Sequence, residues 1–144
     1  MKKETEEWVR IAIEDFQSAK YLLEKSLFRM VCYHSQQAVE KLAKAILVEH
    51  DIEIPRTHNL LDLNNAVRRL GYDPPLSDED AVFLNSIYRS RYPFDAGLLP
   101  YGEPTGKDAQ KALEIAKTVT IWFREKLKFQ DISHETDLGT NKPD

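Results

Sequence analysis

The stretch that decides the fold is residues 28–50, FRMVCYHSQQAVEKLAKAILVEH, which contains neither proline nor glycine. Its apolar side chains recur at the three- and four-residue steps of an α-helix. Small alanines within it would allow another helix to approach closely. The stretch therefore predicts a helix of about 34 Å that packs against its neighbours. The side chains expected to face inward are Val31, Ala38, Leu42, Ala45 and Ile46.

Residues 5–26 predict a preceding helix of about 33 Å, a length that suits a hairpin with residues 28–50. Glutamates at its start lie where the helix dipole favours negative charge. The side chains of its expected apolar stripe are Trp8, Ile11, Ala12, Phe16, Ala19, Leu22, Leu23 and Leu27.

Beyond residue 50 the sequence predicts three more helices, separated by prolines and glycines. A connector over residues 51–56 comes first, because Pro55 disfavours a helical conformation for the residue before it. A loop is expected over residues 91–104, which hold three prolines. The expected helical spans with their caps are Thr57 or Asn59 to about Leu70 (ended by Gly71), Ser77 to Arg89 or Ser90, and Thr105 to about Phe129.

These elements predict an all-α fold, an up-and-down four-helix bundle with an additional short helix. The expected domain covers residues 1–129, and the polar residues 130–144 are expected to be a disordered tail. The 144 residues are 42% hydrophobic and 31% charged, which excludes a collagen, a disordered chain and a disulfide scaffold. With one cysteine, no bilayer-long apolar run and no signal-peptide pattern, we expect a cytoplasmic protein without membrane association.

The formal net charge of −4 is unevenly distributed along the chain. Residues 130–144 contain four acids and one base, hence −3, which leaves −1 for residues 1–129. Because residues 1–129 are so close to neutral, they exert no long-range attraction on nucleic acid. Any anionic ligand would therefore have to be held by a local arrangement of cations.

Searches for catalytic motifs find no glycine-rich phosphate loop, no HExxH and no paired cysteines. The four histidines are dispersed, so we expect no metal site and no cofactor. No residue is assigned as catalytic from the residues alone.

Three polar segments remain as candidates for binding. On the helix over residues 28–50, Lys41 and Lys44 lie within about 40° of Gln37. This face is either solvated, with His34 hydrogen-bonded in the core, or a polar seam between helices, or a phosphate contact made by the lysines.

Arg56 and His58 stand at the start of the third helix, where free backbone N–H groups and the dipole favour an anion. The alternative is a threonine cap beside an exposed histidine. Arg89, Arg91 and Tyr92 lie at the exit of the fourth helix, and two arginines and a tyrosine there could grip a phosphate and stack a base. The alternative is an ion pair of Arg91 with Asp95 that fixes the loop. The candidate ligand-binding residues are thus Arg56, His58, Arg91, Tyr92, Lys41 and Lys44.

Four segments together resemble the HEPN domain (higher eukaryotes and prokaryotes nucleotide-binding). They are the first helix with Trp8 and Asp15, LFRMVCYHSQQAVEKLAKAIL at 27–47, IPRTHNL at 54–60, and RYP at 91–93. The resemblance implies an all-α bundle that often forms homodimers, often beside a minimal nucleotidyltransferase in a toxin–antitoxin or related pair. Many HEPN proteins are metal-independent ribonucleases with an Arg-x4–6-His signature near the start of the last long helix.

This chain departs from that signature. Arg124 in the last helix is followed by no histidine until His134. Arg29 and His34 have the right spacing but lie in the second helix, about 140° apart around its axis. We therefore expect a HEPN protein without a recognisable catalytic motif that binds a nucleotide or RNA, or a nucleotidyltransferase partner. The alternatives are a ribonuclease toxin whose residues come from separate segments, such as Arg91 and His58, and a non-catalytic assembly module.

Overall fold

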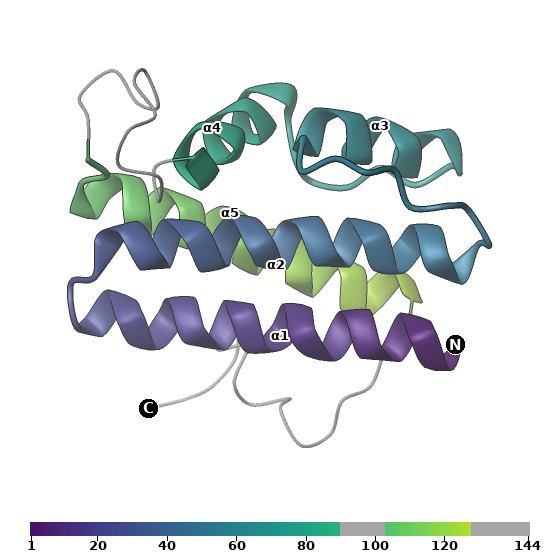
Figure 1. Ribbon diagram of the computed structural model, residues 1–144, viewed down its shortest axis with the longest axis horizontal. Helices are drawn as coiled ribbons and strands as arrows, with labels where there is room; N and C mark the ends of the chain where they lie inside the picture. Colours follow the sequence, from purple (N-terminus) through teal and green to yellow (C-terminus); the bar gives the residue numbers. More distant parts are fainter. Residues whose placement is uncertain (90–102, 128–144) are drawn as a thin grey trace.

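The computed structural model describes residues 1–89 and 103–127, and its regular structure is helical throughout (Figure 1). The helices are α1 (Lys3–Glu24), α2 (Phe28–Glu49), α3 (Leu60–Arg69), α4 (Asp78–Arg89) and α5 (Gly106–Leu127). These two ranges contain no strand. The predicted all-α fold is confirmed. The expected tail at 130–144 and most of the expected loop at 91–104 lie outside the described residues.

Helix α2 is the central element of the bundle. Helix α1 runs antiparallel along one side of it, α3 and α4 lie along the opposite side, and α5 passes behind (Figure 1). Because of these neighbours, 14 of the 22 residues of α2 are buried, so more than one face of the helix is covered. All five side chains expected to face inward from α2 are buried, as predicted.

The apolar stripe of α1 differs in phase from the predicted one. Ile11 is 42% exposed and Leu27 is 51% exposed, whereas Val9 and Ile13 are buried. The inward stripe follows positions 9, 12, 13, 16 and 19, and Ile11 lies about 100° around the helix from Ala12. Leu27 falls in the turn between α1 and α2 and belongs to neither helix. Those two assignments to the core were wrong.

Helices α3, α4 and α5 begin at the predicted capping residues. The side chain of Asn59 accepts a hydrogen bond from the backbone N–H of Leu61, and the Ser77 hydroxyl accepts one from Asp80. Thr105 and Asp108 bond reciprocally at the start of α5. Helix α3 stops before Gly71, whose φ of +97° suits glycine.

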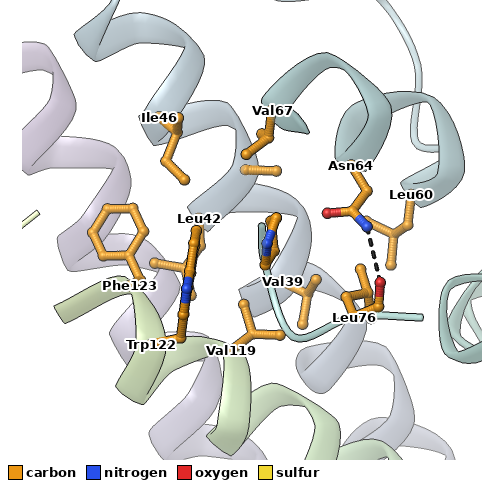
Figure 2. A pocket seen from close by; sticks show the side chains of 12 residues that line it. Val39, Leu42, Ile46, Leu60, Asn64, Val67, Leu76, Val119, Trp122 and Phe123 are labelled. Carbon is orange, nitrogen blue, oxygen red and sulfur yellow. Dashed lines mark hydrogen bonds between the residues drawn. The ribbon is translucent and has the colours of Figure 1, made fainter. Parts of the chain in front are cut away.

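A small apolar cavity lies between α2, α3, α5 and the connector at 74–76 (Figure 2). Leu42 and Ile46 line it from α2, and Trp122 and Phe123 line it from α5. Its volume is about 20 Å³, room for roughly one water molecule. That space is too small for a nucleotide, so the candidate functional site has to be sought among the polar side chains.

Candidate functional site

A buried carboxylate, that of Glu40, holds the polar residues of α2 and the connector together. Its side chain is only 3% exposed. Lys44 Nζ donates to Oε2 at 2.7 Å, and His58 Nδ1 lies 2.9 Å from the same oxygen. Gln36 Nε2 donates to Oε1 at 3.0 Å, and Gln37 Nε2 lies 3.5 Å from that oxygen. We call these five residues the Glu40 cluster.

The environment of Glu40 keeps its carboxyl group ionised. Burial alone would raise its pKa, but hydrogen bonds from Lys44, Gln36 and His58 outweigh burial, and the pKa lies below its ordinary value of 4.5. An ionised carboxylate can only accept hydrogen bonds, so the Nδ1 of His58 carries a proton and donates a hydrogen bond to Glu40. The imidazole of His58 is therefore held in one orientation, with its side chain 60% exposed.

A second polar group joins α1 to α2. Asp15, buried in the middle of α1, contacts His34 Nδ1 through Oδ1 at 2.8 Å. Its other oxygen, Oδ2, accepts a hydrogen bond from Lys41 Nζ at 2.6 Å. We call these three residues the Asp15 cluster. Each cluster thus pairs one buried carboxylate with one lysine and one histidine.

Three alternatives were open for the face of α2 that carries Gln37, Lys41 and Lys44. The geometry of the two clusters corresponds to the second of them, a polar seam between helices. Gln37, Glu40 and Lys44 are buried, which a solvated face would not be. The two candidate lysines are engaged with different carboxylates, Lys41 with Asp15 and Lys44 with Glu40. The structure brings Lys44 and His58 together through Glu40 and places Lys41 in the other cluster.

The start of α3 uses its backbone donors internally. The N–H of Asn59 donates to the Thr57 hydroxyl, that of Leu60 to Asn85 Oδ1, and that of Leu61 to Asn59 Oδ1. A phosphate at this helix end would therefore depend on side chains more than on these three amides.

The three remaining sequence candidates are Arg56, Arg91 and Tyr92. Arg56 is exposed on the connector, two residues before His58. Arg91 and Tyr92 lie outside the described residues. Of the six candidates, His58 and Lys44 thus belong to the Glu40 cluster, and Arg56 lies two residues before His58 in the sequence.

The sequence candidates did not include the carboxylates that organise both clusters. Glu40 and Asp15 were not chosen as ligand-binding residues, because the selection followed cations and aromatic groups that bind phosphate, and Asp15 entered only through the family resemblance. One signal was available for each of them. Glu40 lies four residues before Lys44, the spacing of a helical ion pair. Asp15 lies three residues after Ala12 and four before Ala19, the spacing of the apolar stripe of α1.

The described residues support neither an arginine–histidine site in α2 nor a cysteine nucleophile. Arg29 pairs with Glu103 and His34 with Asp15, so the Arg-x4-His spacing in α2 does not form a joint site. Burial, and to a lesser extent the charge of Asp108, raises the pKa of the Cys32 thiol to about 12, which makes it a poor nucleophile.

Within residues 1–89 and 103–127 we find no group of side chains suited to a metal ion. In the same part of the chain, no helix is both long and apolar enough to cross a lipid bilayer.

Sequence comparison identifies the family to which this helical chain belongs. Residues 5–126 match the HEPN domain family, and the chain belongs to that family. It is 31% identical over 135 residues to a protein of Methanocaldococcus jannaschii named "Putative toxin MJ1304", covering 84% of this chain and 86% of that protein.

Two solved structures are similar to this chain. The crystal structure of ST0689, described as an archaeal HEPN homologue, has a TM-score of 0.57 and 26% identity, covering 88% of this chain and 99% of that one. The structure of TT1696 from Thermus thermophilus has a TM-score of 0.67 and 23% identity, covering 87% and 99%. This second likeness concerns the fold alone.

Proposed function

We propose that this protein is the HEPN member of a toxin–antitoxin-like pair and that it binds a phosphate-bearing ligand, a nucleotide or RNA, at Arg56 and His58. The observation that carries the proposal is the fixed and exposed imidazole of His58, held through Nδ1 by the buried Glu40. Arg56 is exposed two residues away and can grip a phosphate bidentately. The name of the Methanocaldococcus relative supports the toxin role.

The remaining candidates contribute to the same proposal. Arg91 and Tyr92 would supply a second guanidinium and a ring that stacks on a base. Lys44 would act mainly through Glu40, and Lys41 from the neighbouring Asp15 cluster. No metal ion or cofactor is needed for this binding.

The direct test is a titration of AMP, ATP and short single-stranded RNA against the wild type, Arg56→Ala and His58→Ala. Arg56→Ala removes a charge-assisted hydrogen bond worth about 1.5–3 kcal/mol, and His58→Ala removes one that Nε2 donates when both ring nitrogens carry protons, so we expect about tenfold weaker binding or more. Arg10→Ala is the matched control, because this exposed arginine pairs with Glu7 on α1 and its loss changes the net charge equally. Equal affinity of all four proteins for every ligand would refute the site.

A second candidate function is a metal-independent ribonuclease. The observation in its favour is that two imidazoles, those of His34 and His58, each contact a carboxylate through Nδ1. A carboxylate in that place fixes the tautomer of an acid–base histidine.

We also propose that the protein forms a homodimer and that its functional partner is a minimal nucleotidyltransferase. Exposed apolar side chains on the α1–α2 hairpin support self-association, among them Ile11, Tyr21 and Met30. Sedimentation at tens of micromolar should show a species twice the 16.7 kDa chain mass. A single 16.7 kDa species at that concentration would reject the dimer.

A further inference from the structure

The hydrogen bond between Glu40 and His58 decides the chemical character of the second ring nitrogen of the histidine. The Glu40 side chain is 3% exposed, and its Oε2 lies 2.9 Å from His58 Nδ1. This bond needs a proton on Nδ1, because the ionised carboxylate has none to donate. In the neutral imidazole the lone pair therefore resides on Nε2, which is then a hydrogen-bond acceptor.

The contacts around His58 hold the imidazole in this orientation. Gln36, which is fully buried, donates to Glu40 Oε1 at 3.0 Å and to the backbone carbonyl of His58 at 3.5 Å. On the other side, the N–H of Asn59 donates to the Thr57 hydroxyl at 3.0 Å. Turning Nδ1 toward a ligand would take a donor away from a buried carboxylate, which is costly. A ligand at this site would therefore meet Nε2.

A phosphate oxygen cannot form a hydrogen bond with Nε2 of the neutral ring. The oxygens of an ionised phosphodiester carry lone pairs and no hydrogen, so two acceptors would face each other. A proton on Nε2 converts this nitrogen into a donor and gives a charge-assisted hydrogen bond to the phosphate. Water supplies that proton, since neither the phosphodiester nor the ionised Glu40 has one to give. The complex then contains one more proton than the separate partners.

The charges of the Glu40 cluster indicate that this proton is taken up with the ligand. Lys44 Nζ lies 2.7 Å from the same Oε2 that contacts His58, so Lys44 already neutralises Glu40. A neutral imidazole completes the cluster without excess charge. The charged groups recorded near the ring are Glu40 and Lys44 from α2, with Arg56 on the connector itself. The side chains that bond to each other at the adjoining start of α3, both uncharged, are Asn59 and Asn85.

We propose that the Arg56–His58 site binds a phosphodiester group together with one proton on Nε2 of His58, and that Glu40 is the positioning residue that imposes this requirement. The inference rests on the proposed function, since it concerns the regulation of the same site. Binding of the ligand and binding of the proton strengthen each other, so the affinity rises as the pH falls. Above the ordinary imidazole range near pH 6.5, each pH unit weakens binding about tenfold.

The competing explanation is that His58 only ties the connector to α2, while Arg56 alone binds the phosphate. Arginine keeps its charge throughout the neutral pH range. An affinity that depended on Arg56 alone would therefore be the same on both sides of neutrality. The pH dependence of binding separates the two explanations.

The experiment is a calorimetric titration with a short 2′-fluoro-uridine oligonucleotide that lacks terminal phosphates. This probe cannot be cleaved through a 2′-hydroxyl, and none of its groups titrates between about pH 6 and about pH 8. The wild type should bind it about tenfold more weakly, or more, at the higher pH. Titrations at the higher pH in two buffers of different ionisation enthalpy should show an uptake of close to one proton for each ligand bound.

Three variants assign the proton. His58→Gln, at an exposed side chain, should bind weakly, with the same affinity at both pH values and no proton uptake. Glu40→Gln removes the counter-charge of the imidazolium, so its binding profile should shift toward lower pH. His50→Gln is the matched control and should keep the wild-type profile, because this exposed imidazole contacts the Tyr72 hydroxyl, away from Arg56.

The wild type and His58→Gln decide the outcome even if Glu40→Gln does not fold. The inference is overturned if the wild-type affinity is the same at both pH values, or if His58→Gln still takes up a proton. Binding with constant affinity would refute only this inference. An absence of binding at either pH, by contrast, would refute the proposed function itself.

Discussion

Glu40→Ala is expected to lower the free energy of unfolding by about 3–5 kcal/mol, because it leaves a buried lysine without its counter-charge. The side chain of Lys44 is 11% exposed and its ammonium group lies 5.8 Å from the centre of the Trp8 ring, so it is poorly placed to regain water. The substitution also removes the acceptor of Gln36 and His58. Urea denaturation at pH 7 measures the effect.

The matched control for this prediction is Glu14→Ala, at an exposed position on α1. Its free energy of unfolding should stay within about 0.5 kcal/mol of the wild type. A loss below 1 kcal/mol for Glu40→Ala would mean that the Glu40 cluster contributes little to stability.

The carboxylate of Glu40 should also make the free energy of unfolding depend on pH. The pKa of Glu40 is lower in the folded chain than its ordinary 4.5, so the unfolded chain binds more protons between the two values. The stability that the ionised group contributes is complete above about pH 4.5 and is lost as the pH falls through the folded pKa. The difference between wild type and Glu40→Gln should therefore shrink below pH 4.5, and a difference constant from pH 7 to pH 3 would contradict this.

The fold could be predicted from the sequence because local signals agreed with one another. The helical periodicity of residues 28–50, the caps at Asn59, Ser77 and Thr105, and Gly71 after α3 all indicated the same elements. The phase of the α1 stripe was harder to assign. Apolar residues occupy positions 8, 9, 11, 12 and 13, and only the packing against α2 decides which of them are covered.

The candidate site was less predictable, because it depends on contacts between distant residues. Asp15 meets His34 and Lys41 across 19 and 26 residues, and His58 meets Glu40 across 18. Sequence reasoning could place Lys41 and Lys44 on one helical face but not assign them to different carboxylates. The seam also explains why HSQQAVEK and RTH occur together, since Gln36 and Glu40 of the first segment bond to His58 of the second.

Leu42→Ala is the second substitution with a large expected effect, a loss of about 2–5 kcal/mol in the free energy of unfolding. Leu42 is buried at the centre of α2, where it lines the small apolar cavity with Trp122 and Phe123 (Figure 2). Truncation would enlarge a void that already exists, and the surrounding structure relaxes only partly to fill it. The expected loss therefore lies in the upper part of that range.

Two control substitutions separate the packing effect from other causes. Leu42→Met keeps the volume and should cost less than about 1.5 kcal/mol. Val82→Ala, at a side chain 50% exposed on α4, should stay within about 0.5 kcal/mol of the wild type. Chemical denaturation of the three variants measures all of these values. If Leu42→Ala cost less than 1 kcal/mol, Leu42 would not be a core residue and the central position of α2 would be wrong, because this side chain connects α2 to α5 through the cavity wall.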